Sequence, residues 1–187
     1  MKKYYFLLIL LFTSPLLLYP CRCREVSAME GVKNSDIVFK GRILSVVRTS
    51  KYEDAGLKVD TTGLDDMAKQ MKSYAPLYVV LVKAERVYKG KNVSDTIKIL
   101  TPVASMTCGY RYFEEGDDCI IYATSEHVPF LLGANSLTSV IPMPRVYPEQ
   151  GMYWTNHCTR TQQWNREEEE EIILSVMETI KKRVCQN

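Results

Sequence analysis

The sequence feature that most constrains the fold is a set of six cysteines, all of which follow an apolar leader. The chain has 187 residues, and the basic pair Lys2 and Lys3 precedes an apolar run over residues 4–12. This pattern is typical of a secretory signal peptide, to which we assign residues 1–20. Export leads to an oxidising compartment, where cysteines form disulfides. The six cysteines are Cys21, Cys23, Cys108, Cys119, Cys158 and Cys185.

The first two cysteines of the exported chain need partners that are distant in the sequence. Cys21 and Cys23 are too close along the chain to bridge each other easily. Spacing alone does not choose among the possible pairings of six cysteines. The rival interpretation is a zinc site formed by Cys21, Cys23, Cys108 and either His157 or Cys158. No Cys-x-x-Cys spacing supports this site, but the residue pattern leaves both alternatives open.

Composition and charge exclude several classes of protein. The formal net charge of +2 comes from Lys2 and Lys3, so residues 21–187 carry 22 basic and 22 acidic side chains. A neutral chain of this kind lacks the electrostatic footprint of a nucleic-acid-binding protein. The apolar fraction of 46% and the charged fraction of 25% are typical of one globular domain. No later apolar run is long enough to cross a membrane, so we expect no membrane span.

The residue pattern predicts a mainly β domain. Residues 25–32 can form a short helix, and residues 50–75 are a charged insertion with a helical patch around Leu64 and Met71. Gly41 lies where a bulge or sharp bend is expected. We expect one further short strand within residues 128–157. Strand-forming residues predict the main strands over 37–47, 77–88, 96–100 and 119–123.

The chain closes with an amphipathic helix. Asn165 and Glu168 are spaced as in a capping box, and acidic residues 167–171 and basic residues 181–183 complement the helix dipole. We interpret the glutamate run as capping plus a solvated face, not as a site for calcium or a basic partner. Several short strands with a few helices favour a small closed or nearly closed barrel. The predicted apolar stripe of the helix contains Ile172, Ile173, Val176, Met177, Ile180 and Val184.

A series of short motifs, taken in order, carries a family resemblance. They are Cys21-Arg22-Cys23, residues 35–41, residues 87–90, Cys108-Gly109-Tyr110, residues 158–161 and Trp164-Asn165. Together they resemble the netrin-like (NTR) module of the tissue inhibitors of metalloproteinases (TIMPs), over about residues 21–180. The resemblance implies an OB-fold-like, five-stranded Greek-key barrel with flanking helices. Residues 21–187 then form a single domain, with the insertion at about 50–75.

The resemblance also implies a disulfide pattern. It predicts the bridges Cys21–Cys108 and Cys23–Cys158. The remaining cysteines, Cys119 and Cys185, have no counterpart in the inhibitory module of that family. Two alternatives stay open for them: a third bridge that pins the final helix to the barrel, or free or intermolecular thiols.

The same resemblance implies inhibition by coordination of a partner's metal ion. The free α-amino group and carbonyl oxygen of Cys21 would chelate the catalytic zinc of a metalloprotease, while Arg22 would enter the protease's primed specificity pocket. The protein would need no cofactor and no metal of its own. The expected protease-binding ridge contains Cys21, Arg22, Cys23, Thr107, Cys108 and Gly109.

Two residues favour an alternative function. Arg22 replaces the small side chain that the family usually has, and burying an unpaired guanidinium is costly. Pro20 before Cys21 fits poorly with cleavage at that bond, and lipid attachment to Cys21 would consume its amine and thiol. The alternative is a secreted or lipid-anchored NTR-like module that binds another extracellular protein without inhibition. We do not expect an enzyme, because His127 and His157 lack an accompanying nucleophile motif.

Overall fold

The computed structural model describes most of residues 21–187. The described residues are 23–60, 62, 76–103, 109–125, 145–147 and 151–184. The predicted signal peptide, Cys21, Arg22 and the predicted helical patch around Leu64 and Met71 lie outside them. No helix among the described residues is long and apolar enough to span a bilayer.

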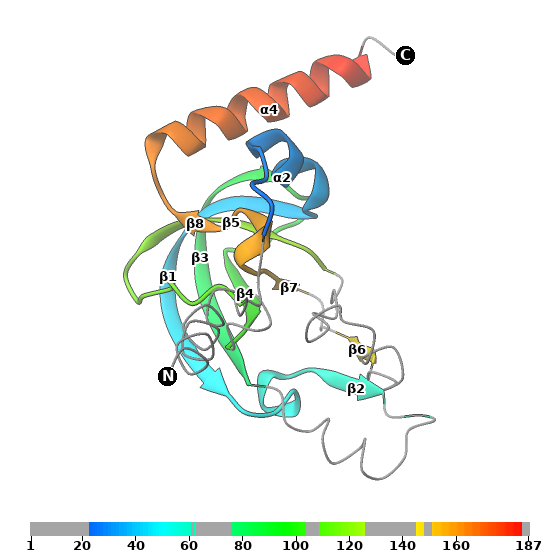
Figure 1. Ribbon diagram of the computed structural model, residues 1–187, viewed down its shortest axis with the longest axis vertical. Coiled ribbons are helices and arrows are strands. Elements are labelled where there is room, and N and C mark those ends of the chain that lie inside the picture. Colours follow the sequence, from blue (N-terminus) through cyan, green and yellow to red (C-terminus); the bar gives the residue numbers. More distant parts are fainter. Residues whose placement is uncertain are drawn as a thin grey trace, which may run out of the picture.

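A six-stranded mixed sheet forms the centre of the molecule (Figure 1). The strand order is β7-β4-β3-β1-β5-β8, in which β4 and β7 are parallel and all other neighbours are antiparallel. All four predicted main strands are present, so the mainly β prediction is confirmed. The strands are β1 (Ile37–Thr49), β3 (Leu77–Lys89), β4 (Thr96–Pro102), β5 (Asp118–Ala123), β7 (Met152–Trp154) and β8 (Gln162–Gln163).

A second sheet has two strands, β2 (Lys58–Asp60) and β6 (Arg145–Tyr147). The 3-10 helix η2 (Glu53–Ala55) precedes β2 in the chain. The prediction of one short strand within residues 128–157 was therefore wrong, because that range contains both β6 and β7. Each of these strands has three residues, too few to show an alternating pattern. They form because each finds a partner from another part of the chain.

The long strand β1 joins the two halves of the main sheet, pairing with β3 along one edge and with β5 along the other. Its pairing with β3 shifts register between Lys40 and Gly41, which confirms the predicted irregularity. A Cβ atom at Gly41 would lie 2.7 Å from the carbonyl oxygen of Lys83, so only glycine fits this close approach without a shift.

An isolated bridge connects β7 to the residue that follows β5. The backbone N–H of Thr124 donates to the Trp154 carbonyl at 2.9 Å, and the Trp154 N–H donates to the Thr124 carbonyl at 2.7 Å. The sheet therefore curls so that its edge strand β7 approaches β5.

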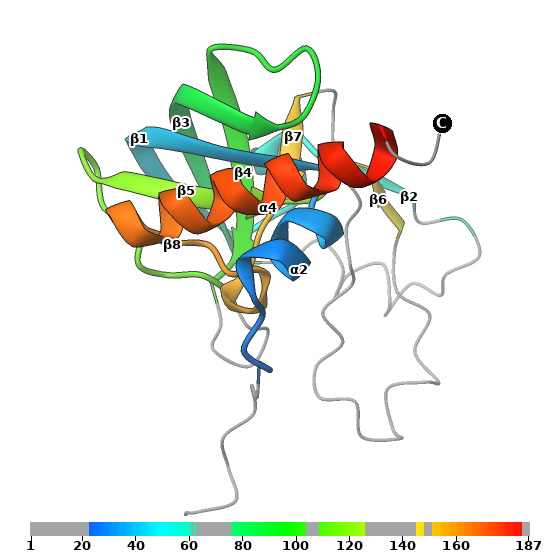
Figure 2. The ribbon, with the colours of Figure 1, turned by 90° about the horizontal axis from the view of Figure 1, so that it is seen from above.

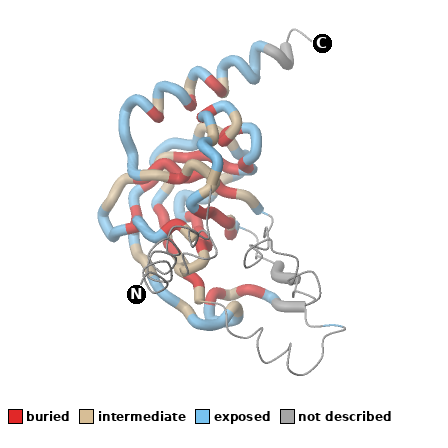
Figure 3. The backbone as a smooth tube through the Cα atoms, viewed as in Figure 1, coloured by how far each residue is buried: buried red, intermediate tan, exposed pale blue. Residues whose placement is uncertain are grey.

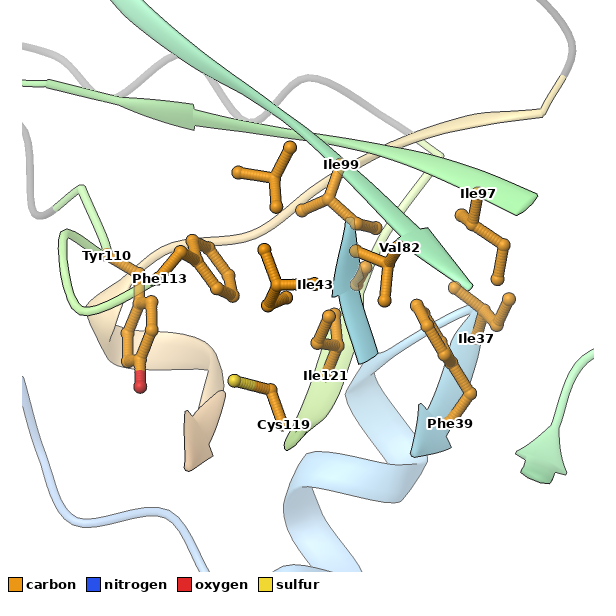
Figure 4. Packing of buried hydrophobic residues seen from close by; sticks show 12 residues of the cluster. Ile37, Phe39, Ile43, Val82, Ile97, Ile99, Tyr110, Phe113, Cys119 and Ile121 are labelled. Atoms are coloured by element: carbon orange, nitrogen blue, oxygen red, sulfur yellow. The ribbon is translucent and has the colours of Figure 1, made fainter. Parts of the chain in front are cut away.

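Buried residues follow the central strands of this curled sheet (Figure 3), and their side chains form clusters on both of its faces. Alternation along β5 shows the division, because Cys119 and Ile121 belong to the inner cluster whereas Ile120 and Tyr122 pack with Ile172 of the C-terminal helix. Figure 4 shows the inner cluster. Its buried members are Ile37, Phe39, Ile43, Val80, Val82, Ile97, Ile99, Tyr110, Phe113, Cys119, Ile121 and Ala123.

Two helices cover the outer face and lie beside each other (Figures 1 and 2). In α2 (Ala28–Asn34), the hydroxyl of Ser27 caps the first turn, and the Lys89 ammonium binds the carbonyl groups of Val32 at 2.7 Å and of Ser35. In α4 (Arg166–Val184), Asn165 accepts a hydrogen bond from the Glu168 backbone at 2.8 Å, which confirms the predicted cap.

Two expectations about α4 were wrong. Glu168 is not on a solvated face, because it is 4% exposed and its carboxylate binds Tyr122 and Arg160. The predicted apolar stripe is also only partly packed. Ile172 is fully buried, whereas Met177 and Ile180 are 62% and 56% exposed. Met177 lies on the side of α4 opposite its buried residues, and the second half of the helix, which contains Ile180, projects past the sheet in Figure 1.

Candidate functional site

The candidate site is the corner where Cys23, the first described residue, meets the segment that follows β7. A disulfide joins Cys23 to Cys158, with a Cα–Cα distance of 5.1 Å across 135 residues of sequence. This bridge confirms one of the two pairings that the family resemblance implied. It also excludes the zinc alternative, which needed Cys23 as a thiolate ligand. Of the other expected ridge residues, Cys21, Arg22, Thr107 and Cys108 lie outside the described residues.

The sequence around Cys158 forms a rigid turn. The 3-10 helix η5 (His157–Thr159) begins at Asn156, whose side chain accepts a hydrogen bond from the Cys158 N–H at 2.6 Å. The Thr159 side chain reaches back to the Asn156 backbone, which completes a capping box. Arg160 then ends the turn with a φ of 73°. The disulfide is therefore attached to a short element that its own polar side chains hold in place.

Arg160 fixes the N-terminal segment a second time. Its guanidinium donates to the backbone carbonyl of Val26, three residues after the disulfide. It also binds both carboxylate oxygens of Glu168, at 2.7 and 2.6 Å, and the carboxylate of Glu171 at 2.9 Å. The hydrogen bonds to Glu168 raise the pKa of Arg160 further above its ordinary value. This one side chain thus connects the N-terminal segment, η5 and α4.

A buried polar network lies beneath Arg160. The Tyr122 hydroxyl donates to Glu168, and the Thr155 hydroxyl donates to the Tyr122 carbonyl at 2.9 Å. The Thr161 hydroxyl lies 2.6 Å from that of Thr155 and accepts a hydrogen bond from the Tyr122 N–H. Burial is the main cause that raises the pKa of Tyr122, followed by its bond to Glu168. Tyr122 therefore stays neutral and acts as a hydrogen-bond donor that stiffens the corner.

Gly109 is the second expected ridge residue that the structure describes. A Cβ atom on Gly109 would lie 1.6 Å from the carbonyl oxygen of Pro102, so the two backbone segments touch. The following residue, Tyr110, donates its N–H to the hydroxyl of the fully buried Thr101 at 2.8 Å. The loop that follows Cys108 is therefore held against the end of β4 at a position where only glycine fits.

A shallow groove runs beside the disulfide as two adjoining hollows of about 780 and 460 Å³. Tyr110 and Tyr112 line both hollows; their rings meet edge to face at 5.6 Å between centroids. His157 stacks on Tyr110 at 6.4 Å. One end of the groove is formed by residues 23–27 and the other by Gln163, Trp164 and Asn165, while Gln162 lines both hollows. The groove thus combines the exposed rings of Tyr112 and Trp164 with amide side chains.

Cys119 does not belong to this site. It is a free thiol, fully buried among the inner cluster, with Tyr110 and Phe113 nearby (Figure 4). Of the two alternatives left open for this cysteine, the structure thus has the unpaired thiol and not the third bridge. The physical reason is strand alternation, because Cys119 faces away from α4, the helix that precedes Cys185. Burial, followed by the charges of Asp117 and Asp118, raises the pKa of Cys119 to about 12.

Sequence reasoning missed the Arg160–Glu168 pair and the tyrosine groove. Glu168 lies within a run of five glutamates, and nothing in that run singles it out as buried. The motif at residues 158–161 contains Arg160, but the sequence assigned no role to this residue.

Within the described segments, no group of three or more His, Cys, Asp and Glu side chains is arranged to hold a metal ion. No protein-family model matches this chain, and no curated protein matches its sequence.

Proposed function

We propose that this protein is an exported, TIMP-like inhibitor of a zinc metalloprotease, acting through an N-terminal ridge that begins at Cys21. The observation that carries the proposal is the disulfide that joins Cys23 to Cys158 in the turn η5. Cys21 is two residues before this anchor. A disulfide of this kind and a predicted leader both favour an extracytoplasmic location.

The strand pairings support the finer assignment of an OB-fold-like barrel. Starting from β1, the chain of neighbours runs to β3, β4 and the parallel strand β7. The Thr124–Trp154 bridge then leads from β7 to the end of β5, which pairs with β1. This ring of five strands supports the proposal of a small Greek-key barrel, because an OB-fold is a partly open barrel of that kind. Its loops are the usual binding elements of such a fold.

Inhibition would follow from chelation by a segment that is ordered before binding. The Cys21 amine, if it is free, and the Cys21 carbonyl are two adjacent ligands for an open zinc position. The disulfide at Cys23 and the Arg160–Val26 hydrogen bond limit the motion of residues 23–26, so little conformational entropy of these residues would be lost on binding. Arg22 would then require an acidic group in the specificity pocket of the protease, since an unpaired buried guanidinium is unfavourable.

A second candidate function has its own supporting observation. The groove offers the exposed rings of Tyr112 and Trp164 next to polar side chains, and aromatic residues are enriched in protein interfaces. An NTR-like module could bind an extracellular protein there without inhibiting a protease. This function does not need a free amine on Cys21.

The deciding experiment begins with the exported protein itself. Intact-mass and N-terminal peptide analysis shows whether Cys21 is the first residue, and whether its amine is free. The purified protein is then assayed against a panel of zinc metalloproteases. Three variants accompany it: one extra alanine before Cys21, the same alanine at the C-terminus as the matched control, and Arg22→Thr.

The inhibitor proposal expects inhibition by the wild type and the C-terminal control, and its loss when alanine precedes Cys21, at an unchanged Tm. Arg22→Thr is expected to change which proteases are inhibited. An acylated Cys21 amine, or additional residues before Cys21, would overturn chelation by Cys21 and favour the binding module. Inhibition that survives the N-terminal alanine would overturn chelation by Cys21 as the cause of inhibition.

A further inference from the structure

The helix α4 has a second apolar surface that faces solvent. Leu174, Met177 and Ile180 are 67%, 62% and 56% exposed. The opposite side of the helix already packs on the domain through Glu168, Ile172 and Ser175, which are all buried. A helix that covers a sheet with one face needs only polar residues on the other. Three large apolar side chains on the solvent side therefore indicate an interaction surface.

The outward face of α4 has the spacing of a helix-pairing seam. Glu170, Leu174, Met177 and Lys181 follow one another at intervals of four, three and four residues. This spacing keeps side chains in one line along a helix, as the a and d positions of a coiled coil do. All four residues are exposed. Figure 2 shows α2 beside α4 on the domain, and Figure 3 shows the exposed residues of α4 along its outer side.

We propose that α4 pairs in antiparallel orientation with α4 of a second copy of this chain, about a two-fold axis between Leu174 and Met177. In this arrangement, Leu174 lies opposite the partner's Met177. The symmetry then also places Glu170 opposite the partner's Lys181. A single register thus brings apolar groups together at the centre and opposite charges together at both ends. This self-complementarity is what a two-fold symmetric interface requires.

The charge distribution along the helix selects both the partner and the orientation. Residues 167–171 are all glutamates, whereas residues 181–183 are Lys, Lys and Arg. Antiparallel pairing places the acidic half of each helix beside the basic half of the other. Parallel pairing would place like charges together, and would also align the two helix dipoles unfavourably. Glu170 already has an ion pair with Arg166 in its own helix, at 2.9 Å, and both side chains remain largely exposed.

The test measures the dimer dissociation constant of the full exported chain by sedimentation equilibrium over a wide range of protein concentrations. Five proteins are compared: wild type, Glu170→Lys, Lys181→Glu, the double variant with both changes, and Lys91→Glu. The last is the matched control, because Lys91 is exposed and lies outside α4. Circular dichroism and Tm establish that each variant is folded. Because all substituted side chains are exposed, we expect every variant to fold.

The proposal expects a reversible dimer for the wild type and for Lys91→Glu. Each single variant of the seam places like charges opposite each other twice, by symmetry, and should raise the dissociation constant about tenfold. The double variant should return it to the wild-type value, since it exchanges the charges of both partners. A wild type that stays monomeric throughout would overturn the proposal. So would a dimer that the single variants do not weaken, or that the double variant does not restore.

Discussion

Arg160 and Glu168 form a two-pronged ion pair at 2.7 and 2.6 Å, and the carboxylate in this pair is only 4% exposed. Arg160 belongs to the turn that carries the disulfide, whereas Glu168 belongs to the first turn of α4. The pair therefore couples the candidate binding corner to the helix that covers the sheet. A buried carboxylate that loses its partner remains as an uncompensated charge, and this asymmetry gives a direct test.

Arg160→Ala should lower the free energy of unfolding by about 3 kcal/mol. The backbone strain of a positive φ stays the same, because alanine also carries a Cβ atom. The matched control is Arg166→Ala, whose ion pair with Glu170 is exposed and should contribute about 0.5 kcal/mol or less. Urea denaturation measures both values. Equal losses for the two variants would contradict the role given to Arg160.

A second acidic group of α4 predicts a dependence of stability on pH. Glu169 accepts hydrogen bonds from the hydroxyl of Tyr88 at 2.7 Å, from the indole of Trp164 at 2.9 Å and from Arg86 at 3.0 Å. These donors, with Tyr88 as the largest cause, lower the pKa of Glu169 below its ordinary value of 4.5. A lowered pKa means that this contribution to stability is present above pH 4.5 and is lost as the pH falls through the folded pKa.

Tyr88→Phe removes the largest of these causes, so the pKa of Glu169 should rise toward 4.5. The difference in unfolding free energy between wild type and variant should be largest at neutral pH, and should shrink as the pH falls below 4.5. Carbon NMR of the Glu169 carboxyl group and denaturation at several pH values measure the two effects. Tyr112→Phe is the control, because Tyr112 is exposed and lies outside this cluster. A pH-independent difference would refute the assignment.

The contrast between Ile172 and Glu168 shows what the sequence could predict about α4. Periodicity placed the helix and its cap correctly, because caps and apolar spacing are local. It could not show that Glu168 is buried, since its partner Arg160 comes from a separate turn and Tyr122 from a strand. It also assigned Met177 and Ile180 to the packed stripe, although both side chains are exposed and Met177 lies opposite the buried residues of the helix. Which positions of the helix the sheet covers depends on the tertiary structure and cannot be seen in the local sequence.

The strands show the same limit. The run over residues 77–88 is long and rich in β-branched residues, so its own composition identifies it as a strand. The three-residue strand β7 exists only because β4 and Thr124 supply hydrogen-bonding partners. At the candidate site, the Cys23–Cys158 bridge was implied by the family resemblance and is present. The groove beside it was not predicted, because Tyr110 and His157 come together only through the folded chain.

The free thiol of Cys119 gives a chemical prediction. A pKa of about 12 leaves almost no thiolate at neutral pH, and burial blocks access. Cys119 should therefore not react with iodoacetamide in the native protein, but should react once urea unfolds the non-reduced chain. Val47→Cys, at a site that is 55% exposed, is the positive control that reacts without unfolding. Peptide mapping that finds Cys119 unreactive in urea would indicate a disulfide and contradict the structure.

Gly109→Ala tests the contact that positions the chain after Cys108. The new methyl group would meet the Pro102 carbonyl at 1.6 Å, and a backbone atom cannot move aside as a flexible side chain can. We expect a loss of about 3 kcal/mol of unfolding free energy, because the loop or β4 must shift. Gly116→Ala is the matched control. It has a φ of 92° but nothing within 4 Å, so it should lose about 1 kcal/mol from backbone strain alone. If Gly109→Ala proves the milder change in denaturant titrations, the loop is not held against β4 and the ridge is less rigid than proposed.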